Sequence, residues 1–335
     1  MKLNTHTLSI IAFLSIALTA SSYAQKAKNK MAENYTSHVD PYIGSGGHGH
    51  IFVGANVPFS AVQLGPSTIF EGWDWCSGYN YSSNTILGFT HTHLSGTGIG
   101  DLNDILLLPV AGKVALKKAT KEDASGYGST FSHANETVKP GYYSVLLDKY
   151  NVKAELTTSE RVGFHKYTFN SKEEAHILLD LADGVGWDSP KETYIKKTGK
   201  RTIVGYRHSK GWADDQRLFF AMEFSEDISN VALYDSTSVV KGTEGNALKM
   251  KAVLDFVNKT KNVIMVKVGL SPVSCDNALA NIKADAAYPD PTRPAPITAT
   301  INGAITANLT SGAVNFAPLD LQASLSDKAF PKVMP

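Results

Sequence analysis

Short runs of β-branched and aromatic residues recur along most of the chain, and turn residues separate many of them. The runs partly alternate between apolar and polar positions, and no helical period lies between them. Many short strands at such spacing are typical of a β-sandwich. Because residues 35–272 are many for one simple sandwich, we predict an all-β domain there, built as a large two-sheet supersandwich. Seven runs predict its clearest strands: Gly141–Asp148, Val152–Thr158, Gly163–Phe169, Ile177–Leu181, Arg217–Phe224, Leu248–Val257 and Val263–Gly269.

The pattern changes after the last of these strands. Residues 273–288 predict a short linker helix, with Ser274 as its N-cap and Asp276 as a favourable charge in its first turn. From residue 289 onward the chain has seven of its 14 prolines and only three acidic residues, with little amphipathic period. We predict that residues 289–335 form an irregular, poorly ordered tail.

The N-terminus has the features of a secretory signal peptide over residues 1–24. Lys2 precedes an apolar run, Leu8–Ala20, and Ser22–Ala24 forms a small-x-small cleavage site. The run is too short to cross a bilayer, and no later stretch is apolar enough, so we predict no membrane span. The polar residues 25–34 predict a disordered leader. The mature protein is therefore expected outside the cytoplasm, in the periplasm or the extracellular space.

Charge and cysteine content exclude several classes of protein. The chain has 32 Lys+Arg against 31 Asp+Glu, a net charge of +1, which argues against nucleic acid as a partner. Its 43% of hydrophobic residues is typical of a globular protein. Two cysteines are too few for a disulfide scaffold or a four-thiolate zinc site. An oxidising compartment permits a bridge between Cys76 and Cys275, and the sequence leaves open whether one forms.

The segment from Tyr35 to Pro109 concentrates the residues that carry chemistry. Four of the ten histidines and two of the four tryptophans lie within it between His48 and His93, in glycine-rich stretches. Glycine lets the backbone approach a ligand closely, and such crowding on loops is typical of a binding site. The candidate substrate-binding residues are His48, His50, Trp73, Asp74, Cys76, Ser77, Gly78, Tyr79, His91 and His93.

Three interpretations compete for the His-x-His pairs. On an extended strand His91 and His93 would point to one face and share a ligand, such as zinc, but a third ligand is not evident at any diagnostic spacing. In the second interpretation the imidazoles are structural, and they bond backbone carbonyls and hold the glycine loops in place. The third interpretation is recognition of a hydroxyl-rich ligand. Trp73 and Asp74 favour it, because an indole covers the apolar face of a sugar while a carboxylate binds its hydroxyls. If Trp73–Trp75 is extended, however, one of these side chains points into the core.

Motifs for other chemistries are absent or weak. The chain has no Gly-x-Ser-x-Gly elbow, phosphate loop or His-Glu-x-x-His, and the glycine run at residues 96–100 has no βαβ context. These motifs therefore identify no catalytic residue and no metal ligand.

The same segment closely resembles the N-terminal domain of glycoside hydrolase family 92, a family of exo-acting bacterial α-mannosidases. The resemblance runs from about Val39 to about Ala287. The matching stretches, in order, include Val39–Gly44, Gly46–His50, Val57–Phe59, Gly72–Asp74, Cys76–Tyr79, Phe89–Gly98, Phe131–Glu136, Pro140–Tyr143, Arg161–His165, Val204–Arg207 and Trp212–Gln216.

The resemblance implies a galactose-mutarotase-like supersandwich followed by an (α/α)₆ barrel. It also implies calcium-dependent, inverting hydrolysis of α-mannosides in N-glycans or mannan, with a Glu acid, an Asp base and most calcium ligands on the barrel. The sandwich would supply sugar contacts, above all from Trp73, Asp74 and the Cys76–Tyr79 stretch.

The chain departs from the family pattern after Ala287. Instead of a linker helix and a barrel, the tail from residue 289 onward matches nothing in the family, as a truncated or frame-shifted reading frame would. We expect a domain that is inactive without its barrel, and a free-standing carbohydrate-binding module is the alternative. Smaller departures at Val53, Ser60 and Thr68 weaken the assignment of individual loops.

Overall fold

The computed structural model describes residues 38–57, 59–182, 184–257 and 262–285, together with three strands within residues 298–316. The predicted signal peptide and leader lie outside the described residues.

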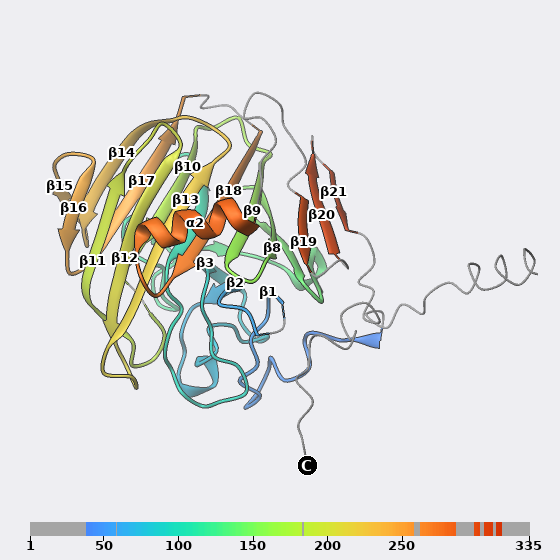
Figure 1. Ribbon diagram of the computed structural model, residues 1–335. Helices are drawn as coiled ribbons and strands as arrows, with labels where there is room; N and C mark the ends of the chain where they lie inside the picture. The colour runs from blue at the N-terminus through green and yellow to red at the C-terminus, as the bar shows by residue number, and fades with distance from the viewer. Residues whose placement is uncertain are drawn as a thin grey trace, which may run out of the picture.

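Two nine-stranded antiparallel sheets face each other and form the predicted all-β sandwich (Figure 1). The first sheet has the order β1 (Ala55–Asn56), β2 (Gln63–Thr68), β3 (Thr85–Thr90), β4 (Leu106–Ala111), β10 (Ala175–Asp180), β17 (Met250–Phe256), β14 (Ile228–Asp235), β15 (Ser238–Val240), with β5 (Ser129–Thr130) paired to β3. The second has the order β16 (Glu244–Ala247), β11 (Ser189–Lys197), β12 (Thr202–Lys210), β13 (Gln216–Phe224), β18 (Val263–Ser271), β9 (Val162–Phe169), β8 (Val152–Thr158), β7 (Tyr142–Leu147), β6 (Glu136–Lys139).

The main hydrophobic core lies between the two sheets. Strand β18 shows why its sequence forms this layer, because Ile264, Val266 and Val268 alternate with other residues and all point into the core. Strand β4 is buried at every position, so its apolar run has no polar face to reveal a period. The core fixes the register of the sheets, and the loops at their ends carry the candidate site.

Helix α2 (Cys275–Asp285) lies across the outer face of the second sheet (Figure 1). Its Ala278 and Ile282 pack on Val162 and Phe164 of β9 in a second, smaller apolar cluster. The Ser274 Oγ accepts a hydrogen bond from the backbone N–H of Asn277, which confirms the predicted N-cap.

All seven strands that the sequence predicts are present, as β7, β8, β9, β10, β13, β17 and β18. Three further short strands lie in the segment predicted as an irregular tail: β19 (Thr298–Ile301), β20 (Ile305–Thr310) and β21 (Ala313–Phe316), which form an antiparallel sheet of their own. The sequence pattern predicts no strand there. The rest of residues 286–335 lies outside the described part.

Lys267 on β18 gives the fold a distinct pH dependence above neutrality. Its side chain is 1% exposed, and burial lowers its pKa to about 7. The unfolded chain binds this proton up to about pH 10.4, so stability is expected to rise as the pH increases from 7 towards that value.

Lys267→Met is expected to stabilise the domain by about 1–4 kcal/mol at pH 7, because it removes a buried charge without losing volume. It should also flatten the rise in stability between pH 7 and about 9.5. Urea unfolding at several pH values measures both effects, with the exposed Lys249→Met as the matched control. An unchanged slope in the Lys267 variant would show that another group titrates.

Candidate functional site

Four of the predicted residues meet at the protein surface. Trp73 and Asp74 lie in a single 3₁₀ turn, η2 (Trp73–Trp75), which the chain enters through Gly72 at φ 131°, a backbone angle that favours glycine. His48 and His50 come from a separate glycine-rich loop and reach the same carboxylate. We call Trp73, Asp74, His48 and His50 the Trp73 surface. Because the segment is a turn and not a strand, the expected alternation of side chains does not apply.

The indole of Trp73 is exposed yet held in place. It is 57% exposed, and its Nε1–H donates to the carbonyl of Gly98 at 2.8 Å. A Cβ on Gly98 would lie 2.5 Å from the indole, so only glycine lets the ring approach this closely. The His50 ring meets the indole edge-on, with ring centroids 4.2 Å apart. The indole of Trp73 therefore presents an apolar surface to solvent in a fixed position.

Asp74 is positioned by two histidines. Its Oδ1 lies 2.7 Å from His48 Nδ1 and 3.1 Å from His50 Nε2. The hydrogen bond from His48 is the main reason that the pKa of Asp74 lies below its ordinary value, with a smaller contribution from His50. Its Oδ2 makes no hydrogen bond within the described part of the chain, and the side chain is 25% exposed. The site therefore presents an ionised acceptor beside the indole.

The stretch from Cys76 to Tyr79 lies beneath this surface and supports it. Cys76 Sγ donates to the carbonyl of Thr97, and Ser77 Oγ contacts the carbonyl of Ile51. Tyr79 is 1% exposed, and its hydroxyl donates to the buried carboxylate of Glu136. Gly78 is also buried. These side chains face the interior, so any contact from this stretch to a ligand would have to come from its backbone.

His91 and His93 are both in the interior and bond different partners. His91 Nδ1 donates to the carbonyl of Ile105 at 2.7 Å, which leaves its Nε2 as an acceptor in the neutral ring. His165 Nε2 lies 2.9 Å from that nitrogen and must donate to it, while His165 Nδ1 accepts from the Tyr167 hydroxyl. This directed chain of hydrogen bonds links β9 of the second sheet to the end of β3 in the first.

His93 is equally occupied, because its Nδ1 donates to the carbonyl of Ser77 and its Nε2 accepts from Thr90 Oγ1. Burial lowers the pKa of His91 to about 3 and that of His93 to about 4. With every ring nitrogen engaged, neither imidazole has a lone pair for zinc, and within the described ranges no three His, Cys, Asp or Glu side chains come together as metal ligands. The structure favours the structural interpretation of this pair.

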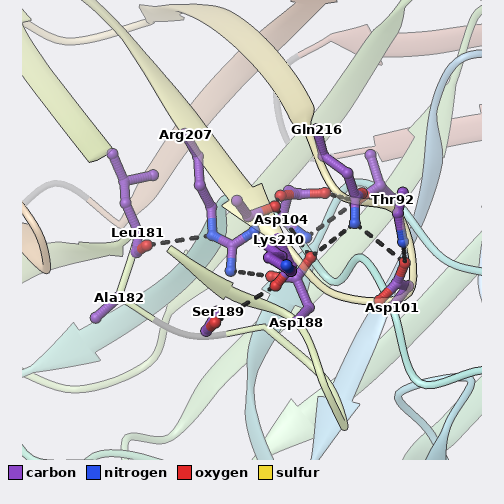
Figure 2. A network of polar contacts seen from close by, with 12 residues as sticks. Thr92, Asp101, Asp104, Leu181, Ala182, Asp188, Ser189, Arg207, Lys210 and Gln216 are labelled. Carbon is purple, nitrogen blue, oxygen red and sulfur yellow. Dashed lines mark hydrogen bonds and ion pairs between the residues drawn. The ribbon is translucent and has the colours of Figure 1, made fainter. Parts of the chain in front are cut away.

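A buried ionic network links strands β12 and β13 to Asp101, Asp104 and Asp188 (Figure 2). Arg207 on β12 is fully buried, and its guanidinium bonds Asp104 at 2.6 Å and also Asp188. Burial is the main cause that raises the pKa of Asp188, against the opposing effect of Arg207. Gln216 donates to both Asp188 and Asp101, which extends the network.

Two further exposed tryptophans, Trp187 and Trp212, lie next to residues 98–101. Neither is among the candidate residues predicted from the sequence. The backbone N–H of Trp187 donates to the carbonyl of Gly100, and the backbone N–H of Trp212 donates to Asp101 Oδ1 at 2.7 Å. The two residues are 59% and 71% exposed. Residues 98–101 thus contact three exposed tryptophans, from three different loops. The only sequence signal was that Trp212 falls within a stretch resembling family 92.

Both cysteines are free thiols, Cys76 buried and Cys275 half-buried. Among the described residues, no helix has the length and apolar character needed to cross a membrane.

Comparison with known proteins identifies the family. Residues 38–271 match the glycosyl hydrolase family 92 N-terminal domain. The chain belongs to glycoside hydrolase family 92. This confirms both the resemblance and the sandwich fold that it implies. A solved structure of a family 92 α-mannosidase from Bacteroides thetaiotaomicron, in complex with mannoimidazole, is 33% identical with a TM-score of 0.73.

The other similar proteins agree with the family. An inverting family 92 mannosidase from Bacteroides thetaiotaomicron VPI-5482 is 23% identical with a TM-score of 0.65, which shows the shared fold. An uncharacterized secreted glycosidase of Arthroderma benhamiae is 25% identical over 156 residues, 44% of this chain and 20% of that relative. The two solved structures align with 77% and 78% of this chain but only 35% of their own length. The family 92 chain therefore spans about a third of the length of these two solved structures.

Proposed function

We propose that the described domain is the sugar-contacting N-terminal part of an exported α-mannosidase that acts on α-mannosides of N-glycans or mannan. The observation that carries the proposal is the Trp73 surface, where an exposed indole lies beside an ionised carboxylate. Similarity to the α-mannosidase of Bacteroides thetaiotaomicron supports mannose as the sugar. The secreted relative and the signal-like N-terminus support export.

The chemistry of the Trp73 surface suits one face of a pyranose. An indole ring covers the C–H face of a sugar, and a carboxylate accepts hydrogen bonds from its hydroxyls. Asp74 Oδ2 is available for such bonds because only Oδ1 is occupied by His48 and His50. The two histidines fix the carboxylate in advance, which lowers the entropy cost of binding.

Asp74 is unsuited to protonating a leaving group. A general acid in glycoside hydrolysis needs a raised pKa, whereas hydrogen bonds from His48 and His50 lower that of Asp74. Inverting hydrolysis also needs a second carboxyl group about 6.5–9.5 Å away. The Trp73 surface contains a single carboxylate. We therefore place the acid and the base on an (α/α)₆ barrel domain, as the resemblance implies, and expect this chain to be inactive alone.

Calcium is part of the same proposal, but the described residues do not fit it. Calcium takes six to eight oxygen ligands. No group of three His, Cys, Asp or Glu side chains in the ranges that the structure describes is arranged to hold an ion. The ion would therefore be held by residues of the barrel, and we derive no step through it.

We expect methyl α-mannoside to bind the purified chain with a millimolar Kd, about −4 kcal/mol, because a single open face offers few contacts. Trp73→Ala should weaken binding at least tenfold and Asp74→Asn by a similar factor, while Val239→Ala at an exposed position of β15 should not change it. Isothermal titration calorimetry measures the affinities.

An aryl α-mannoside assay with the same preparations is expected to show no turnover. Clear turnover would contradict the absence of the acid and base from this chain. Micromolar affinity would instead favour the alternative, a free-standing carbohydrate-binding module, because a half-pocket does not reach that value.

A further inference from the structure

The two tryptophans outside the Trp73 surface lie at the same end of the sandwich as that surface. The last residue of β10, Asp180, pairs with the first residue of β4, Leu106, and the first residue of β11, Ser189, pairs with the last residue of β12, Lys210. Because paired strand ends lie side by side, the loops that continue from them leave the sandwich together. These loops are residues 91–105, 181–188 and 211–215, and they carry Trp187, Trp212 and the carbonyl that holds the indole of Trp73.

The contacts that hold the three tryptophans are close together. Trp73, Trp187 and Trp212 bond Gly98, Gly100 and Asp101 respectively. Residues 98 and 101 are three Cα steps apart, at most about 11 Å. The three exposed residues therefore start from anchor points that a short oligosaccharide can span.

The loops that carry Trp187 and Trp212 are ordered by contacts of their own. The carboxylate of Asp101 accepts hydrogen bonds from the backbone N–H groups of Trp212 and Ala213. A Cβ on Gly211 would lie 1.8 Å from Asp101 Oδ1, so only glycine allows this approach. Before Trp187, the N–H of Val185 donates to the carbonyl of Leu102. Because the backbone beside both tryptophans is already fixed, a ligand has little of it left to order.

Polar groups separate the indoles, which favours a glycan over a protein partner. Within residues 98–101, 184–188 and 211–215, all of them described, Trp187 and Trp212 are the large apolar residues that are exposed. Lys210 and Asp214 form an exposed ion pair beside Trp212, at 3.0 Å. A stable protein interface needs a contiguous apolar core, which single indoles among polar and glycine residues do not supply. An oligosaccharide instead offers separate C–H faces with hydroxyl groups between them.

We propose that Trp187 and Trp212 bind further sugar residues of an oligosaccharide whose terminal mannose contacts Trp73. The inference rests on the function proposed for the Trp73 surface and extends it to two more residues. It makes the preferred ligand an oligosaccharide of two or more sugars, and a monosaccharide occupies only the part next to Trp73.

Calorimetric titration of methyl α-mannoside and of an α-linked mannotriose into the same preparations tests this inference. The trisaccharide should bind the unchanged protein about tenfold more tightly than the monosaccharide, because it gains at least one indole contact. Trp187→Ala and Trp212→Ala should each remove part of that gain and together all of it, while the affinity for methyl α-mannoside stays the same. Val239→Ala, at an exposed position of β15, is the control and should change neither affinity.

The outcomes separate this inference from the function on which it rests. Equal affinities for the two ligands, with methyl α-mannoside binding still lost in Trp73→Ala, would overturn the inference and leave the proposed function standing. Binding of neither ligand would remove both. A trisaccharide gain that persists in the double variant would also overturn the inference. Self-association of the chain that Trp212→Ala abolishes in sedimentation experiments, together with equal affinities, would show that these indoles contact protein instead.

Discussion

Lowering the pH from about 7 to about 5 is expected to destabilise this domain strongly, because burial makes three histidines resist protonation in the folded state. His91, His93 and His165 are at most 5% exposed, and burial is the main cause of a lowered pKa in each. In the unfolded chain their pKa values return to about 6.5. Stability is therefore complete above that pH and is lost as the pH falls towards the folded pKa values.

The expected loss of unfolding free energy is large compared with the stability of the domain. At about pH 5 each histidine contributes about 2 kcal/mol in favour of unfolding, hence about 6 kcal/mol for the three. Domains of this kind are stable by roughly 5–15 kcal/mol, so the loss is comparable to the whole.

Urea unfolding followed by circular dichroism between about pH 6.5 and 5 measures the slope, which should approach about 4 kcal/mol per pH unit. His165→Gln should reduce the slope by about a third, because its amide can still donate to His91 without titrating. His38→Gln, at an exposed position, is the matched control and should leave the slope unchanged. A free energy of unfolding that stays level over this interval would contradict the buried, neutral histidines.

Arg207→Met is expected to destabilise the domain by about 3–5 kcal/mol, since it leaves buried carboxylates without their cation. Asp104 and Asp188 both bond the guanidinium, and their side chains are 4% and 0% exposed. Methionine keeps much of the side-chain volume, so the loss reports mainly on charge.

The adjacent strand β13 offers a matched control. Arg217 forms an exposed ion pair with Asp215, and Arg217→Met should change stability by less than about 1 kcal/mol. Urea midpoints of the two variants measure the difference. Asp188→Asn combined with Arg207→Met should recover part of the loss, because it removes one of the stranded charges. Equal midpoints for Arg207→Met and Arg217→Met would show that the buried network carries no special stability.

The sequence predicts strands where apolar and polar residues partly alternate. It does not predict β2 and β4, in which that alternation is absent. Strand β2 (Gln63–Thr68) contains Gly65 and Pro66, which resemble a turn. Gly65 is there because a Cβ would lie 2.2 Å from the carbonyl of Val53. Strand β4 is buried on both faces and so shows no period. In each case a contact with a distant segment overrides the local pattern.

The candidate site was also predicted only in part. Composition and resemblance brought together Trp73, Asp74, His48 and His50, which do meet at one surface. Of the three interpretations of His91 and His93, the structure favours the structural one, because β3 ends at Thr90 and each ring bonds a backbone carbonyl in the interior. Their partners, His165 and Ser77, are distant in sequence and leave no local signal.

Indole N–H resonances offer a direct view of sugar binding, because the chain has only four tryptophans. Nitrogen-15 spectra of the tryptophan-labelled protein give one indole signal per residue, assigned by Trp→Phe substitution. Trp75 Nε1–H donates to Ser83 within the protein and serves as the internal control.

Titration with methyl α-mannoside should shift the Trp73 indole signal progressively, with a millimolar midpoint, and leave that of Trp75 in place. Because the Trp73 indole is held at the carbonyl of Gly98, its signal starts from a single defined position. A Trp73 signal that stays fixed up to saturating sugar would contradict the central claim that this surface is the mannose-contacting face of a family 92 enzyme.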